Sequence, residues 1–430
     1  MIAPLRVAVA GLGTVGAGVV KLLAANAETV AARCGRPVVV TAASARDPRK
    51  DRGIPLSGID WYEDAETMAA HAPCDAVVEV IGGAEGTARR VVDAAISRGR
   101  HVVTANKALL AHAGAELARA AESRGVVLAY EAAVAGGIPI IKSLREGLAA
   151  NRVQRVYGIL NGTCNYILTQ MRRSGRAFDD VLGEAQRLGY AEADPSFDID
   201  GVDAAHKLAI LAAVAFGTEV DIAGVHVEGI RHVGALDIRF AGELGFRIKL
   251  LGLARLTEAG LEQRVHPCMV PLETPIAHVE DVFNAVVAEG DFVGRVVSEG
   301  RGAGAGPTAS AVVADLMDIA RGRAPMTFAV PATRLARVAA APIAAHRGAY
   351  YIRLMVRDRP GVIADVTAAL RDQEVSLESM IQRGRHPDEM VPVVLTTHET
   401  REDSLRRALD RIEALDTVLE TPRLIRIEAL

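Results

Sequence analysis

The sequence predicts an α/β protein that begins with a Rossmann-like, doubly wound nucleotide-binding domain. Three observations support this fold class: a glycine-rich turn at residues 11–16, alternating strand and helix patterns up to residue 140, and a β-α-β-β-α pattern after residue 350. Half of the 430 residues are apolar, which is enough for sizeable cores. A chain of this length exceeds one typical domain, so we expect roughly two to four domains.

The composition favours a small-molecule partner in the cytoplasm. The formal net charge is −4, and basic and acidic residues are mixed along the chain, which argues against a nucleic-acid partner. No apolar run reaches the roughly 18 residues of a membrane span, and no signal pattern opens the chain. The four cysteines form no CxxC pair, so neither a zinc site nor a disulfide framework is expected.

The glycine turn GLGTVG lies between an apolar run at 5–10 and a helical pattern through residues 19–23. In such a strand, turn and helix, the backbone at Gly11 and Gly13 can approach a pyrophosphate, and Gly16 permits close helix-strand packing. Thr14 and Val15 lie inside the same turn. A lone GxGxxG is a weak signal, so its place directly after a strand carries the prediction of a dinucleotide site.

The second predicted strand, 38–43, is followed by a residue that bears on the choice of cofactor. An NAD-specific site would place an acidic residue at the end of this strand, whereas this chain has Arg46 before Asp47. A guanidinium can bind a 2′-phosphate, so NADP is favoured. Asp47 keeps NAD possible, and a solvated loop arginine is the alternative.

Further alternation completes the first domain. A strand at 74–81 and a helix at 87–97 are followed by strands at 101–107 and 126–130. Ligands in such sheets bind at the carboxyl ends of strands, so Lys107 is expected on the cofactor side, where it could bind phosphate or polarise a carbonyl. The glycine-rich segment 131–139 is either an interdomain turn or a set of backbone carbonyls that could hold a cation.

An α+β substrate or dimerisation domain is expected from residue 141. A strand at 153–160 precedes a helix that contains Cys164, which we interpret as a packing residue because no histidine lies nearby for a nucleophile. Weakly alternating strands follow, for example 246–253 and 285–287. A glycine-rich loop at 300–308, which includes Gly304, leads into a helix at 309–320 and either approaches the cofactor or is a flexible link.

The stretch LGYAEADPSFDIDGVDAAHK at 188–207 concentrates charged residues before an apolar helical run at 208–216. Asp203 and Lys207 are four residues apart and therefore share one helical face. From spacing alone, a surface ion pair is the more common arrangement.

The C-terminal part has linker composition at 330–348 and then a compact pattern of strand 350–356, turn 358–361, helix 362–371, strands 375–382 and 390–396, and helix 401–415. The predicted division is a nucleotide-binding domain at 1–140 completed by a helix around 305–325, a substrate and dimerisation domain at 141–304, a linker at 330–349, and a βαββα(β) domain at 350–430.

Several segments, in this order along nearly the whole chain, resemble homoserine dehydrogenase of the bacterial type with a C-terminal ACT domain. They are GLGTVG at 11–16, TANKALL at 104–110, YEAAVAGGIPI at 130–140, GILNGTCNYIL at 158–168, the stretch 188–207, and GRGAGAGPTASAVVADL at 300–316. DRPGVIA at 358–364 and VSLESMIQ at 375–382 look like an ACT module.

The resemblance implies reversible NAD(P)H-dependent reduction of L-aspartate 4-semialdehyde to L-homoserine, on the route to threonine, methionine and isoleucine. By the same resemblance Lys207 donates the proton and Lys107 lies at cofactor and substrate. Glu192 and Asp203 hold the amino-acid end of the substrate, and Gly189 contacts the cofactor. Asp198 is expected in the substrate site, where it would orient the lysine, whereas Asp194 and Asp200 are expected only to cap or solvate the turn.

The resemblance also implies a sodium-like cation on the backbone carbonyls of Glu131, Val134, Gly136 and Ile138. The ACT module implies feedback by L-threonine. A middle domain with a sheet and an ACT module together suggest at least a dimer, so a homodimer or homotetramer is expected. The alternative reading is a catalytically inactive amino-acid sensor built on a dehydrogenase fold, although the presence of both lysines speaks against it.

Overall fold

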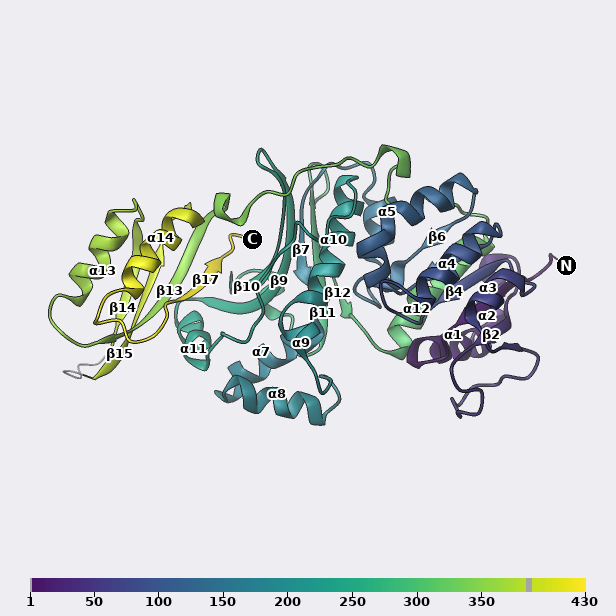
Figure 1. Ribbon diagram of the computed structural model, residues 1–430, viewed down its shortest axis with the longest axis horizontal. Helices are drawn as coiled ribbons and strands as arrows, with labels where there is room; N and C mark the ends of the chain where they lie inside the picture. The colour runs from purple at the N-terminus through teal and green to yellow at the C-terminus, as the bar shows by residue number, and fades with distance from the viewer. Residues whose placement is uncertain (1, 384–388) are drawn as a thin grey trace.

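A six-stranded parallel sheet forms the first part of the fold in the computed structural model, which describes residues 2–383 and 389–430 (Figure 1). Its strand order is β3-β2-β1-β4-β5-β6, the order of doubly wound dinucleotide-binding sheets. The prediction of a Rossmann-like fold is therefore confirmed. The strands are β1 (Leu5–Ala10), β2 (Val38–Ser44), β3 (Asp60–Tyr62), β4 (Ala76–Glu79), β5 (His101–Thr104) and β6 (Leu128–Ala129).

Helices cover both faces of this sheet, as Figure 1 shows. A distant helix joins them, because α12 shares an apolar cluster with α1 and β1. A Cβ atom on Gly18 of α1 would lie 2.8 Å from the carbonyl oxygen of Ala305, so this glycine allows the two helices to approach closely. The helices are α1 (Thr14–Ala25), α2 (Ala27–Cys34), α3 (Ala65–His71), α4 (Thr87–Ser97), α5 (Lys107–Ser123) and α12 (Ala305–Ala320).

The boundary after β5 differs from the expected one. The strand ends at Thr104, and Lys107 is the first residue of α5. The side chain of Asn106 caps this helix by accepting a hydrogen bond from the backbone N–H of Leu109 at 3.1 Å. Lys107 still lies just beyond the carboxyl end of a strand, as expected. As the first residue of α5, however, its backbone is helical and not extended.

An 11-stranded sheet spans the rest of the molecule, with the main order β12-β11-β7-β9-β10-β17-β13-β15-β14. Its middle is a parallel pairing of β17 with β10, in which Cys268 lies opposite Arg426 and Met269 opposite Ile427. The C-terminal module, defined here as residues 347–430, therefore shares a sheet with the middle region. The strands are β7 (Val153–Ile159), β8 (His226–Val227), β9 (Phe246–Thr257), β10 (Gly260–Pro271), β11 (Phe283–Gly290), β12 (Gly294–Arg301), β13 (Arg347–Arg357), β14 (Leu377–Gln382), β15 (Met390–Thr397), β16 (Thr400–Arg401) and β17 (Arg423–Ile427).

Residues 330–348 connect to the C-terminal module but do not hang free. The backbone N–H of Glu219 donates to the carbonyl of Ala336 at 2.9 Å. Leu261 of β10 donates its backbone N–H to the carbonyl of Ala339 and accepts from the N–H of Ala341, both at 2.9 Å. Two short 3₁₀ turns, η4 (Ala332–Arg334) and η5 (Ile343–Ala345), lie within it. Composition indicated a linker, and the backbone bonds fix that linker to the middle region.

Helix α10 (Val202–Phe216) lies between the two sheets, where it packs against α5 and against β7, β9 and β10 (Figure 1). Residues 203–214 of this helix are all buried, and this accounts for the apolar run at 208–216. Asp203 and Lys207 are thereby held at the junction of the two sheets. The remaining elements are η1 (Glu131–Ala133), α6 (Ile140–Lys142), η2 (Ser143–Gly147), α7 (Gly162–Ser174), α8 (Phe178–Arg187), α9 (Ser196–Ile199), α11 (Ala235–Glu243), η3 (Pro275–His278), α13 (Val362–Arg371) and α14 (Glu402–Glu413).

Among the described residues, no single helix has both the length and the apolar character to cross a membrane. The bent pair α1 and α2, at 79°, passes that test by length and composition only.

Candidate active site

A cavity of about 580 Å³ opens between the parallel sheet and the 11-stranded sheet. Its wall includes the glycine turn, the β5–α5 junction, the start of α7, the first turns of α10 and the loop before α12. Residues of η1, of the turn at 189–190, of α9 and of the start of β11 complete it. Of the predicted site residues, those that line it are Val15, Lys107, Gly189, Asp198, Asp203, Lys207 and Gly304. Residues from both parts of the chain therefore meet in one cavity.

Asp203 is the centre of the charged groups in this cavity. Its Oδ2 accepts from Nζ of Lys207 at 2.7 Å, and its Oδ1 lies 3.2 Å from Nζ of Lys107. Lys207 also donates to the carbonyl oxygen of Leu160 at 2.7 Å. Asp203 and Lys207 are only 5% and 8% exposed. The pair is thus a buried one with a second lysine, not the surface ion pair that spacing alone favoured.

The electrostatics of the cluster keep the carboxylate ionised. Burial raises the pKa of the Asp203 carboxyl, but the ammonium groups of Lys207 and Lys107 more than offset this and hold it at about 2. An ammonium group has three N–H donors, and two of those on Lys207 are taken by Asp203 and Leu160. One donor is left for a group inside the cavity.

Asn161 and Thr163, which the sequence analysis did not select, complete the polar wall. Asn161 caps α7, and its Nδ2 donates at 2.8 Å to both Asp198 and Asp203. The hydroxyl of Thr163 donates to Asp198 at 3.2 Å. Burial and the nearby charge of Asp203 raise the pKa of Asp198. The N-cap pattern Asn-Gly-Thr before a helix was the signal that could have identified these residues.

The other acidic residues of the stretch 188–207 have different positions. Glu192 is exposed and is not among the residues that line the cavity. Asp194 accepts from the backbone N–H of Ser196 at 3.1 Å, and Asp200 pairs with Arg231, with Nε of the arginine 2.5 Å from Oδ1. Asp194 and Asp200 therefore shape the turn, whereas the substrate contact of Glu192 stays a prediction.

The glycine turn has the local geometry that a bound dinucleotide requires. Gly11 has φ +101°, and a Cβ atom on Gly16 would lie 1.9 Å from the carbonyl oxygen of Gly11. A Cβ atom on Gly13 would meet no atom within 4 Å, so the backbone there faces open space. Arg52, which the sequence analysis missed, donates from Nε to the carbonyl of Leu12 at 3.0 Å. The residues present fit a nucleotide cofactor at this turn.

Arg46 is exposed two residues beyond the end of β2. This place is at the carboxyl end of the parallel sheet, on the same edge as the glycine turn. Asp47 next to it accepts from the backbone N–H of Arg49 at 2.8 Å, so its carboxylate is engaged within its own turn. The contact of Arg46 with a 2′-phosphate stays a prediction.

The segment expected to bind a cation is buried beside the cavity. Ala135 and Gly136 have positive φ, and a Cβ atom on Gly136 would lie 2.4 Å from the carbonyl oxygen of Gly302. Burial and the charge of Asp315 raise the pKa of Glu131 to about 7. The side chain of Glu131 accepts backbone N–H groups from Ile141 and Lys142. The four predicted carbonyl ligands at Glu131, Val134, Gly136 and Ile138 stay a prediction.

Asn284 of β11 is a further residue of the cavity wall that the sequence analysis missed. It is 1% exposed, yet neither its Nδ2 nor its Oδ1 has a hydrogen-bond partner among the residues that the structure describes. A Cβ atom on Gly302 would lie 2.1 Å from this Nδ2, so the amide lies directly against the loop before α12. Because buried amides are normally paired, Asn284 is poised to bond a group that enters the cavity.

Cys164 does not have the environment of a nucleophile. Burial, together with the charges of Asp198 and Asp203, raises the pKa of its thiol well above the ordinary value. Its Sγ lies 3.3 Å from the carbonyl oxygen of Asp198, so the thiol is engaged in packing. The expectation that Cys164 is a packing residue agrees with this burial.

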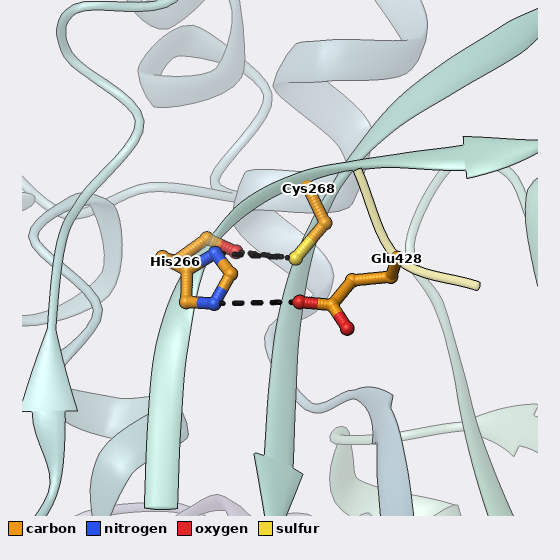
Figure 2. A group of neighbouring side chains, drawn as sticks. All are labelled: His266, Cys268 and Glu428. Carbon is orange, nitrogen blue, oxygen red and sulfur yellow. Dashed lines mark hydrogen bonds and ion pairs between the residues drawn. The ribbon is translucent and has the colours of Figure 1, made fainter. Parts of the chain in front are cut away.

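His266, Cys268 and Glu428 form a buried group whose ligand atoms lie within 4.8 Å of one another (Figure 2). Nε2 of His266 accepts from Arg264 at 2.8 Å, and the same guanidinium donates to Glu428 at 2.6 Å. Burial and the guanidinium groups of Arg426 and Arg264 lower the pKa of His266, which is therefore neutral. A metal ion would face two cations here, so we interpret this group as a hydrogen-bonded cluster.

Comparison with known proteins assigns all three parts of the chain. The NAD-binding domain of homoserine dehydrogenase matches residues 11–131, the homoserine dehydrogenase family matches 139–317, and the ACT domain matches 350–417. A homoserine dehydrogenase of Pseudomonas aeruginosa is 46% identical over 99% of both chains.

Solved structures give the same result. A homoserine dehydrogenase from Thiobacillus denitrificans is 48% identical, with a TM-score of 0.93 over 99% of this chain and 98% of that one. A hyperthermophilic archaeal homoserine dehydrogenase in complex with NADPH is 27% identical, with a TM-score of 0.65 over 75% of this chain and 99% of its own.

Proposed function

The chain belongs to the homoserine dehydrogenase family, and from this premise we propose that it reduces L-aspartate 4-semialdehyde reversibly to L-homoserine with NAD(P)H. The observation that carries the proposal is the Lys107, Asp203 and Lys207 cluster, in which one buried carboxylate holds two ammonium groups in the cavity next to the glycine turn. Carbonyl reduction needs this combination of positive charge and a proton source.

The chemistry divides between cofactor and protein. A nicotinamide cofactor held at Gly11, Gly13 and Gly16 supplies the hydride when it is bound. As the aldehyde accepts that hydride, negative charge grows on its oxygen, and the free N–H of Lys207 donates the proton. Asp203 holds the direction of both lysines, and Lys107, with its side chain 33% exposed, can reach further into the cavity.

The amino-acid end of the substrate carries an ammonium and a carboxylate. We propose that Asp198 and Asp203 lie near the ammonium, because their oxygen atoms form the acidic wall of the cavity. Glu192 is proposed as a third anchor from the turn that follows Gly189. Gly189 has φ +74° and residues 192–194 are exposed, so the turn has room to adjust its position on a bound substrate.

A direct assay tests the proposed function. Purified full-length protein should oxidise L-homoserine with NADP or NAD at least tenfold faster than 3- and 4-carbon hydroxy acids that lack the amino group, because those cannot engage the acidic wall. Equal rates would favour a dehydrogenase for another hydroxy acid. Absence of turnover together with amino-acid binding would favour an inactive sensor.

Replacing Arg46 by alanine should raise KM for NADP more than KM for NAD, by roughly tenfold, because only NADP has the 2′-phosphate that this guanidinium would bind. The measurement is initial-rate kinetics with each cofactor at saturating L-homoserine. Arg49→Ala, three residues further along the same loop, is the matched control and should leave the ratio of the two KM values unchanged. Equal changes for both cofactors in Arg46→Ala would contradict a 2′-phosphate contact.

L-threonine is proposed as a feedback effector that binds the ACT domain. The support is a cavity of about 420 Å³ between the ends of β13 and β14 and the start of α13, lined in part by Arg357, Gly361 and Gln382. Addition of L-threonine to the homoserine assay should lower the rate.

A monovalent cation at the carbonyls of residues 131–138 is tested in the same assay by replacing sodium with tetramethylammonium.

We propose a homodimer or homotetramer, and the edges of the 11-stranded sheet support it. β12 is an edge strand, and the hairpin that precedes it exposes Phe292 by 92% and Val293 by 42%. An aromatic side chain this exposed in the turn beside an edge strand is typical of a contact surface. Light scattering of the eluting protein measures the state directly.

A further inference from the structure

We propose that Glu228 is a positioning residue through which the C-terminal module holds the segment 196–201 of the active site. Glu228 opens what we call the bridge loop, residues 228–231, directly after β8. This loop has the C-terminal module on one side and the segment 196–201 on the other. The inference rests on the proposed function, because it concerns how the substrate cavity is shaped.

The C-terminal side of the bridge loop is a network of ion pairs centred on the buried Arg426. NH1 and NH2 of Arg426 each lie 3.0 Å from a carboxylate oxygen of Glu228. Arg426 is 1% exposed and is also held by Glu402 of α14, whose Oε2 accepts from Nε at 2.8 Å. Arg406 of α14 reaches Glu228 at 3.4 Å. Strand β17 and helix α14 thus both hold this one carboxylate.

The pairing is bidentate, which fixes direction as well as distance. Glu228 also accepts from Nε2 of His226 at 2.8 Å, so its position relative to β8 is set as well. Its backbone N–H donates to the carbonyl of Val265 in β10 at 2.7 Å. The hydrogen-bonded cluster of His266, Cys268 and Glu428 in Figure 2 lies at the same junction, with the histidine and the cysteine on β10 and Glu428 directly after β17.

The other side of the bridge loop lies directly against the segment 196–201. A Cβ atom on Gly229 would lie 2.3 Å from the carbonyl oxygen of Ile199, so only glycine permits this approach. The backbone N–H of Ile230 donates to that same carbonyl at 2.9 Å. Arg231 pairs with Asp200 and donates to Oγ of Ser196 at 3.0 Å.

The position of the segment 196–201 affects the cavity because this segment contains Asp198, which lines it. This carboxylate accepts from Asn161 at 2.8 Å and from Thr163 at 3.2 Å, and Asn161 also donates to Asp203. A shift of the bridge loop therefore moves the acidic wall that we propose for the substrate ammonium. The glycine turn for the cofactor belongs to the other sheet and has no part in this chain of contacts.

A second ion pair across the same junction provides the matched control. Arg353 of β13 donates from Nε to Oδ1 of Asp237 in α11 at 2.6 Å, and Asp237 is fully buried. Within the described residues, no hydrogen bond joins α11 to the segment 196–201. This pair therefore joins the same partner module as the Glu228 pair, but its carboxylate is more deeply buried, with the Asp237 side chain 1% exposed against 26% for Glu228.

The experiment compares Glu228→Gln with Asp237→Asn in the full-length protein. We expect Glu228→Gln to raise KM for L-homoserine by about 3- to 10-fold, the usual range for a residue that acts through another, and to leave KM for the cofactor unchanged. Both variants should lower the Tm by similar amounts, but Asp237→Asn should leave KM for L-homoserine unchanged. Arg426→Lys should share most of the Glu228→Gln effect, so the double variant should change KM by less than the product of the single changes.

A second measurement does not depend on activity. Amide hydrogen exchange of the segment 196–201 should become faster in Glu228→Gln and stay unchanged in Asp237→Asn. If Glu228→Gln does not fold, Arg231→Gln, whose side chain is 49% exposed, should raise KM and exchange in the same way. Equal effects of the Glu228 and Asp237 variants on exchange or KM would overturn the inference. Lack of homoserine oxidation by the wild type would instead refute the proposed function, while the exchange result still decides the inference.

Discussion

Replacing Lys207 by alanine is expected to lower kcat for L-homoserine oxidation by roughly 10²-fold or more, the range for loss of a positioned acid or base. The reason is that Lys207 is 8% exposed and has one N–H left after Asp203 and Leu160 take the other two. Water cannot easily replace it in so enclosed a place. Steady-state kinetics at saturating cofactor measure the change.

Two further variants separate proton transfer from charge. Lys207→Arg keeps the positive charge, but a guanidinium does not release its proton at neutral pH, so kcat should stay low. Lys249→Met removes another buried lysine, which bonds Asn165 and lies outside the cavity, and should keep kcat within a few-fold of the wild type. Near-normal kcat in Lys207→Ala would end the assignment of this lysine as the proton donor.

Replacing Asp203 by asparagine is expected to lower kcat/KM by roughly 10²- to 10³-fold, because one amide cannot hold two ammonium groups in place. The buried lysine at 2.7 Å would lose its counter-charge, and Lys107 at 3.2 Å would be free to turn away. Both KM for L-homoserine and kcat should therefore change. Asp200→Asn is the control, since that carboxylate pairs with the exposed Arg231 outside the cavity. Through the bridge loop it should raise KM for L-homoserine by at most about 10-fold and leave kcat near the wild-type value, so a roughly 10²-fold loss of kcat/KM there would show that the effect is not specific to Asp203.

The pH dependence of stability should report the same carboxylate. The folded pKa of Asp203 is about 2, below the roughly 3.9 of an unfolded chain. Its ionised form therefore stabilises the fold by about 2 kcal/mol above pH ~4, and this contribution is lost as the pH falls through 2. In urea unfolding, the free-energy difference between wild type and Asp203→Asn should shrink as the pH falls from about 5 to 3. A constant difference across that range would contradict the charge explanation.

Much of the nucleotide-binding domain could be predicted from local sequence. The glycine turn, the strand 5–10 and the helix 87–97 agree with the structure because each is set by short-range periodicity and turn chemistry. β3 was missed because its three residues are too short for any periodicity. The general rule for ligand sites in parallel sheets correctly put Lys107 at the cavity, but the residue begins α5 and does not end β5.

The contacts that make the candidate site depend on tertiary structure. Spacing put Asp203 beside Lys207, but only the packing of α10 on α5 brings Lys107 to the same carboxylate. Glu192 was selected through the family pattern, and its exposed position has no local signal. The pairing of β17 with β10 joins segments far apart in sequence, and no periodicity reports which distant strand a given strand will pair with.

The shared 11-stranded sheet has a consequence for how the chain is made. On the ribosome, β10 emerges long before β17, so one side of its Cys268 and Met269 region waits unpaired while the C-terminal module is still being synthesised. An open strand edge is a template for pairing with other chains, and nascent copies on one message lie close together. The last strand of the C-terminal module thus covers the open edge of β10. The edge stays exposed to other nascent chains until β17 has been synthesised and has paired with it.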